Sequence, residues 1–263
     1  MMGEKLETFF CFYILNINRN TSIPYYQPTK ECKKMSNYFQ VSISVSYILV
    51  IHNNSKGVIY VRSAPTEEFD PKFLEEVRRA IQFEEIDLPE IEGDITQASV
   101  KNKYLVMRAG KLTTTILIIS AKPNRFTREA LHSFSIRMES RWGRELKKLY
   151  EQLEGDIDVF HKDTDTRESL NSLVNEVFHL DFTLPHKMGL PPNDLKRMSR
   201  KVWEVGEELA RGKGYIILGE LLTEAKDRLN RSKAVISDII YDFVTRGSMT
   251  PIPLDEFLEK YHR

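Results

Sequence analysis

Histidine is the side chain in this sequence best suited to hold a metal ion or to transfer a proton at neutral pH, and the chain has six histidines. The nearest approach to a cluster is His179 and His186, with Asp181 between them. These residues follow the apolar stripe of a predicted helix, so we interpret them as solvated or helix-capping side chains. No cysteine lies near them, because the two cysteines are Cys11 and Cys32. We therefore predict neither a metal site nor a cofactor.

Sequence signatures of nucleotide binding and nucleophilic catalysis are also missing. No segment reads G-x-x-x-x-G-K-[ST] or G-x-G-x-x-G, so no phosphate-binding loop is predicted. No segment reads G-x-S-x-G, and no set of Ser, His and an acid can be nominated for catalysis. A third possible function is stimulation of GTP hydrolysis by a partner GTPase, to which this chain would supply an arginine such as Arg108 or Arg125. We predict that the protein is not an enzyme.

The charge and composition narrow the class of protein. Lys and Arg together number 38, as do Asp and Glu, so the formal net charge is zero. This balance removes a general attraction to nucleic acids or anionic membranes. The 41% hydrophobic and 29% charged residues fit a soluble globular protein, and no apolar run approaches the roughly 20 residues of a membrane span. Two cysteines indicate a cytoplasmic, reducing compartment.

Residues 1–40 form an unusual leader. A short apolar run over 9–15 is followed by a segment rich in Asn and Pro, with no cleavage site of a secretory signal. Three interpretations compete: a poorly ordered leader, a docking tail, or an upstream extension with true initiation at Met35. We favour the third interpretation. A peptide covering residues 25–33 in mass spectra of the native protein would exclude a start at Met35.

Residues 41–184 carry the pattern of an α+β domain. Apolar residues alternate with serine from Val41, which predicts a strand that continues through Ile51. The turn over residues 53–57 predicts an antiparallel return. Asp70 followed by Pro71 predicts the start of a helix. Three more strands and two longer helices are predicted, over residues 95–100, 104–108, 112–120, 131–153 and 165–178. Since no helix separates most of these strands, we expect a five-stranded, mostly antiparallel sheet, with its helices on one face and the other face open to a partner.

The last third of the chain predicts a separate helical domain. Four Pro and Gly residues within residues 185–192 indicate a linker over 185–194. Beyond it, helices are predicted over 195–211, 219–229 and 232–246, then an extended segment over 247–253 and a closing helix over 254–261. This order is typical of an all-α winged helix-turn-helix domain over residues 195–263.

The charges of this domain favour protein docking over DNA binding. Residues 195–263 contain thirteen Lys and Arg against eleven Asp and Glu, where a DNA reader usually has a clearly basic face. In the predicted recognition helix, Asp238 and Asp242 would point toward the phosphates. A DNA-binding transcriptional regulator remains the alternative function.

The order of elements over residues 45–178 resembles the longin-like fold, and is most similar to the small subunits of clathrin adaptor complexes and their prokaryotic relatives. The related roadblock fold shares much of this layout. The resemblance implies a module that binds proteins in membrane traffic or small-GTPase assemblies. The segments that carry the resemblance are 47–51, 53–57, 58–61, 104–110, 112–119, 128–134, 156–160 and 173–178. The extension after residue 184 departs from the adaptor pattern.

We therefore expect a non-enzymatic scaffold with two modules, able to bridge partners or to self-associate, and near membranes only through those partners. Its partner is expected to be a protein, with a small GTPase or a trafficking complex implied by the resemblance. Aromatic side chains are enriched at interfaces, which nominates Phe69, Phe73 and Tyr241 as contacts; core packing is the alternative for Phe73. Asp238 and Asp242 complete the candidate set.

Overall fold

The computed structural model describes residues 38–53, 56–65, 67–152 and 164–261. The leader up to residue 37, with both cysteines, lies outside the described residues. The loop over 156–160, which contributed to the resemblance, lies outside them as well.

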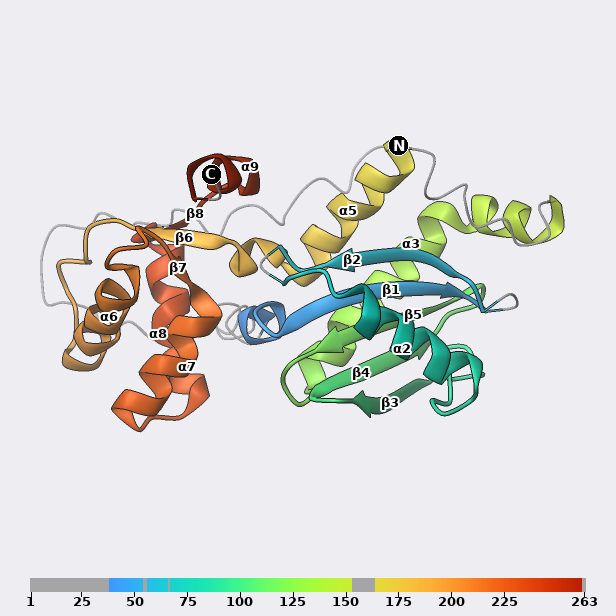
Figure 1. Ribbon diagram of the computed structural model, residues 1–263, viewed down its shortest axis with the longest axis horizontal. Helices are drawn as coiled ribbons and strands as arrows, with labels where there is room; N and C mark the ends of the chain where they lie inside the picture. Colours follow the sequence, from blue (N-terminus) through green and yellow to red (C-terminus); the bar gives the residue numbers. More distant parts are fainter. Residues whose placement is uncertain (1–37, 54–55, 66, 153–163, 262–263) are drawn as a thin grey trace, which may run out of the picture.

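The first part of the chain folds around one five-stranded sheet with the strand order β2-β1-β5-β4-β3 (Figure 1). Every neighbouring pair in this sheet is antiparallel, which confirms the α+β class and the predicted antiparallel pairing. Each predicted strand after the first matches an observed one within one residue at either end. The strands are β1 (Val45–His52), β2 (Val58–Ser63), β3 (Ile95–Val100), β4 (Lys103–Ala109) and β5 (Thr113–Ile119).

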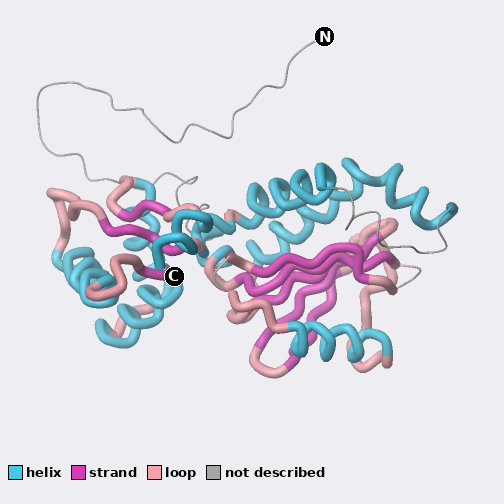
Figure 2. Tube along the Cα trace, turned by 45° about the horizontal axis from the view of Figure 1, so that its top comes forward, coloured by secondary structure: helices cyan, strands magenta, loops and turns pink. Residues whose placement is uncertain are grey.

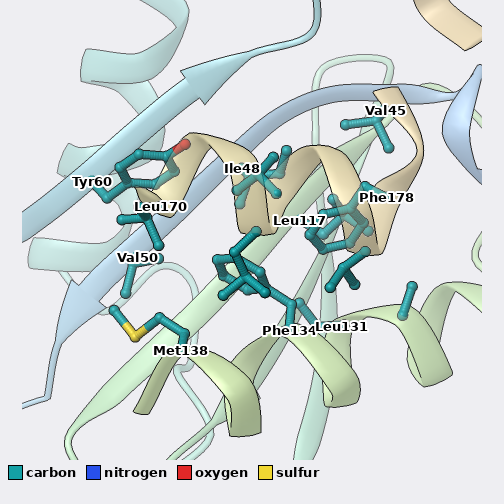
Figure 3. Close-up of a cluster of buried hydrophobic side chains, with 14 of the residues drawn as sticks. Val45, Ile48, Val50, Tyr60, Leu117, Leu131, Phe134, Met138, Leu170 and Phe178 are labelled. Carbon is teal, nitrogen blue, oxygen red and sulfur yellow. The ribbon is translucent and has the colours of Figure 1, made fainter. Parts of the chain in front are cut away.

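Two helices, α3 (Arg125–Gln152) and α5 (Thr164–Phe178), cover one face of the sheet. Figure 3 shows Phe134 and Met138 of α3 with Phe178 of α5 against the strands. Helix α3 is kinked at Trp142, whose φ of −114° and ψ of 15° are not helical, although the sequence predicts one continuous helix. The Trp142 side chain is buried in the same core.

The opposite face of the sheet is covered by helix α2 (Pro71–Gln82). The helix begins as the sequence predicts: the Asp70 carboxylate accepts a hydrogen bond from the Phe73 N–H at 3.0 Å, and Pro71 occupies the first turn. Phe73, Val77 and Ile81 are buried against the strands. The expectation that all helices lie on one face is therefore wrong, as Figure 2 shows. A 12-residue amphipathic helix needs an apolar surface of its own, and the strand residues on this face supply it.

The predicted strand start at Val41 is also wrong. Residues 38–42 are helical, and β1 begins at Val45. The alternation of apolar residues and serine does not decide the conformation here, because Phe39 is drawn into another core. Phe39 is fully buried among side chains of the C-terminal helices.

The C-terminal part combines helices with a second, three-stranded sheet in the order β7-β6-β8. It is therefore not all-α, and the segment predicted as a linker contains strand β6. All three predicted helices and the closing helix are present, with bounds shifted by two residues at most. The elements are η1 (Leu180–Thr183), β6 (Pro185–Met188), α6 (Arg197–Ala210), β7 (Ile216–Ile217), α7 (Leu218–Leu229), α8 (Lys233–Thr245), β8 (Met249–Pro251) and α9 (Leu254–Tyr261).

Aromatic rings connect the two parts of the chain. The Phe39 ring lies 5.0 Å from the ring of Phe182 and 6.1 Å from that of Tyr241. Next to it, Tyr38 packs on His179 at 6.2 Å, and His179 packs on Phe182 at 6.3 Å. The segment just before β1 is thereby anchored in the C-terminal core.

No helix in the described ranges combines the length and the apolar character that crossing a bilayer requires.

Candidate protein-interaction site beside helix α2

A surface depression of about 680 Å³ lies at the N-terminal end of helix α2, where the β3–β4 turn approaches it. It combines aromatic, basic and acidic side chains from three segments: strand β1, residues 67–73 and the turn over 101–103. We call it the α2 depression. Its lining residues are Tyr47, Glu67, Glu68, Phe69, Asp70, Pro71, Lys72, Phe73, Lys101, Asn102 and Lys103.

The aromatic wall of the α2 depression is held in place by one buried hydroxyl group. The Tyr47 hydroxyl donates to the Glu68 carbonyl oxygen at 2.8 Å and accepts from the Asp70 N–H at 3.1 Å. These two bonds fix the backbone on both sides of Phe69, whose ring stands edge-on to Tyr47 with centroids 6.5 Å apart. Phe69 is still 56% exposed. A large apolar side chain is thus presented to solvent on a rigid backbone, at low entropic cost to a partner.

Two of the three lysines that line the α2 depression, Lys101 and Lys103, have partners within the chain. Lys103 forms an ion pair with Glu67, donates to the Ser46 hydroxyl at 3.0 Å, and lies 5.1 Å above the centre of the Tyr47 ring. Lys101 forms an ion pair with Glu76 of α2 at 2.6 Å. Because acids balance these cations, the site fits a protein surface with an apolar anchor better than it fits a polyanion.

The structure brings two of the predicted contact residues together and leaves the other three elsewhere. Phe69 and Phe73 both line the α2 depression, but Phe73 is only 3% exposed and packs in the sheet core. Core packing, the alternative considered for Phe73, is what the structure shows. Tyr47, Lys101 and Lys103 were missed: Tyr47 lies in a strand that the sequence presents as apolar, and nothing in a single sequence brings the two lysines next to it.

Tyr241, Asp238 and Asp242 lie on helix α8, in the C-terminal part of the chain. Tyr241 is half-buried, because Phe39 and Phe182 cover part of its ring. Asp242 forms an ion pair with Arg246 at 2.9 Å. Asp238 is exposed at the surface.

The two histidines that suggested a cluster are each accounted for by packing. The His186 Nδ1–H donates to the Leu184 carbonyl oxygen at 2.8 Å, and burial lowers the pKa of this imidazole to about 4. Burial also lowers the pKa of His179, which has a left-handed backbone conformation. In the ranges that the structure describes, no group of three or more His, Cys, Asp and Glu side chains could hold a metal ion.

The two arginines considered as groups supplied to a partner GTPase differ in their exposure to solvent. Arg108 is 5% exposed beneath helix α3 and donates to the Ser135 hydroxyl at 2.7 Å, so it cannot reach a partner. Arg125 lies on the surface and forms an ion pair with Glu129 at 2.7 Å.

Comparison of the chain with protein-family models and with curated proteins finds no match.

Proposed function

We propose that this protein is a non-enzymatic interaction scaffold, and that it binds a protein partner at the α2 depression. Following the longin-like resemblance, the partner class is a small GTPase or a membrane-trafficking assembly. The protein works in the cytoplasm and reaches membranes only through its partners. Within this proposal, the five-stranded sheet with its three helices is a longin-like module, and the C-terminal part is a winged helix-turn-helix that offers a second contact.

One observation carries the proposal: Phe69 is exposed on a backbone that the Tyr47 hydroxyl holds from both sides. Aromatic side chains, Phe among them, are enriched at the cores of protein interfaces, which are surrounded by a polar rim. The acidic and basic residues around the α2 depression supply such a rim.

The C-terminal part supports protein docking more than DNA binding. Arg228 forms ion pairs with Glu224 and Glu208, and Arg246 forms ion pairs with Asp242 and Asp194. Binding to DNA would require these arginines to exchange carboxylates for phosphates, which reduces the gain from each contact.

Replacing Phe69 with alanine tests the proposed contact. We expect Phe69→Ala to weaken binding to the cognate small GTPase by roughly 30-fold, the loss typical of an aromatic hot spot. The measurement is a pull-down from a panel of purified small GTPases, each loaded with GDP or a GTP analogue, followed by calorimetry on those retained. Phe83→Ala is the matched control, because Phe83 is 72% exposed just after the other end of α2. Retention of no GTPase in either nucleotide state, or equal affinity of Phe69→Ala and the unchanged protein, would contradict the proposal.

The DNA-binding alternative predicts a different result. We expect no measurable binding to bulk duplex DNA even at low salt, because Arg228 of α7 and Arg246, which follows α8, are paired with acids. Fluorescence anisotropy of a labelled duplex at decreasing salt concentrations measures this. Binding that weakens steeply as salt is added would instead favour a transcriptional regulator.

A further inference from the structure

Strand β3 is an open edge of the five-stranded sheet. It is the last strand in the sheet order, and Figure 1 shows no described helix or strand along its outer side. None of its six residues is buried. Open strand edges present unpaired N–H and C=O groups, to which another strand can add.

The hydrogen bonds of β4 identify which groups of β3 are available. The Ala109 N–H donates to the Asp94 carbonyl oxygen at 3.0 Å, so the carbonyl group of Asp94 points toward β4, while its N–H donates to the Ile91 carbonyl oxygen in the preceding turn. Along an antiparallel strand, every second residue directs its backbone N–H and C=O groups toward the same neighbouring strand. Thr96, Ala98 and Val100 therefore direct theirs toward β4. Ile95, Gln97 and Ser99 therefore direct their N–H and C=O groups outward.

The two edges of the sheet differ in their protection. Edge strands commonly avoid unwanted pairing through bulges, prolines or charged side chains. The opposite edge strand, β2, carries Arg62, and its pairing with β1 is interrupted by a register shift. Strand β3, with the sequence ITQASV, has no charged residue and no proline, and it pairs with β4 without a register shift.

The charges that flank β3 identify the strand that fits this edge. Glu90, Glu92 and Asp94 precede it, and Lys101 and Lys103 follow it. An antiparallel copy of the same segment places the acidic end of one strand beside the basic end of the other. We propose that two copies of this chain associate through antiparallel pairing of their β3 strands, which joins two five-stranded sheets into one. This surface borders the α2 depression at Lys101, whereas Phe69 lies just before helix α2.

The register of the pair follows from the outward groups. Because Ile95, Gln97 and Ser99 must face each other, the two-fold axis passes through Gln97, and Ile95 of each copy pairs with Ser99 of the other. Ala98 packs on the α2 side of the sheet, so Asp94 points to that side too. Lys101 contacts Glu76 of α2 and lies on the same side. Asp94 of one copy and Lys101 of the other therefore meet on one face of the joined sheet.

A six-residue strand pair is small compared with a stable protein interface, so we expect a weak dimer that dissociates on dilution. Sedimentation velocity over about two orders of magnitude in protein concentration tests this. We expect a monomer at the lowest concentration and a dimer at the highest. A sedimentation coefficient that stays at the monomer value at every concentration would overturn the proposal. A dimer dissociation constant that does not change when Gln97 is substituted would overturn it as well.

Two substitutions at the axis separate strand pairing from other association. Gln97→Pro removes an N–H group that points outward and is not bonded to β4. Because the dimer is symmetric, this one substitution removes two intermolecular hydrogen bonds. We therefore expect the affinity of the dimer to fall about 30-fold. Gln97→Lys places like charges opposite each other and should also weaken it. Ser63→Lys, at the end of the opposite edge strand, is the matched control and should leave the dimer unchanged. Circular dichroism verifies that each variant is folded. Dimers that persist in both Gln97 variants would show that another surface is responsible.

Discussion

Acidification is expected to destabilise the C-terminal part of the protein by about 3 kcal/mol through His186 alone. The pKa of His186 is lowered from 6.5 to about 4 by burial, which its hydrogen bond to the Leu184 carbonyl oxygen only partly opposes. Its Nε2 atom is buried without a hydrogen-bond partner, so an added proton would be left uncompensated.

The sign of this effect follows from the two protonation states. Above pH 6.5 the imidazole is neutral in both the folded and the unfolded chain, and His186 adds no pH dependence. Between pH 6.5 and about 4 the unfolded chain binds a proton that the folded chain does not, so the free energy of unfolding falls by about 1.4 kcal/mol per pH unit. Below about pH 4 both states are protonated and the loss is complete.

The two tryptophans make this prediction measurable, since Trp142 lies in the sheet core and Trp203 in the C-terminal core. Urea unfolding of a Trp142→Phe background, followed by Trp203 fluorescence at several pH values, reports on the part that contains His186. We expect His186→Leu to remove about 3 kcal/mol of the pH dependence. Lys187→Leu, the same replacement at the exposed neighbour on β6, should preserve it. An unchanged slope in His186→Leu would contradict the assignment.

Removing the Glu139 carboxylate is expected to destabilise the sheet domain by about 3 kcal/mol. This side chain of α3 accepts hydrogen bonds from the backbone N–H groups of Lys111, Leu112 and Thr113, at 2.8 to 2.9 Å, and so ties the β4–β5 turn to the helix. Alanine would leave these donors without their acceptor. Glutamine keeps one carbonyl oxygen and should cost less.

A glycine at the same turn allows a double-mutant test. A Cβ atom at Gly110 would lie 2.4 Å from Oε1 of Glu139 and 2.9 Å from the Thr113 carbonyl oxygen, so Gly110→Ala should itself destabilise the domain. Part of that clash disappears once Glu139 is alanine, and the double variant should therefore lose less than the sum of the two single losses. Urea unfolding followed by Trp142 fluorescence in a Trp203→Phe background measures all four proteins. Additive losses, or a loss below about 1 kcal/mol for Glu139→Ala, would contradict this account of the turn.

Local sequence patterns predict the elements well where local interactions decide them. The Asp70–Pro71 start of α2 and the β1–β2 hairpin need only capping and turn chemistry, and both are found. The boundaries of α9 match the prediction at both ends.

The errors occur where distant parts of the chain meet. Phe39 is helical because it fills a core made by residues far along the chain, and it also covers Tyr241, which the sequence presents as exposed. Strand β6 lies in a segment rich in Pro and Gly and exists through its pairing with β7 and β8. The spacing of apolar residues in the predicted helix over 232–246 predicts that Val235 is buried, but Val235 is 45% exposed. The spacing of apolar residues describes a single helix. It does not show which faces of that helix are covered by neighbouring elements.

The candidate site was predictable only in part. The sequence nominates Phe69 because aromatic residues are enriched at interfaces. It does not show the support from the Tyr47 hydroxyl, which lies 22 positions earlier in the sequence. The open edge of β3 required the strand order, which a single sequence does not provide.

Hydrogen–deuterium exchange of the full chain, alone and bound to the small GTPase retained in the pull-down, tests the proposed site most directly. We predict slower exchange on binding at residues 67–73 and 101–103, with the rest of the sheet domain unchanged. Protection confined to helix α8, with no change around Phe69, would contradict binding at the α2 depression.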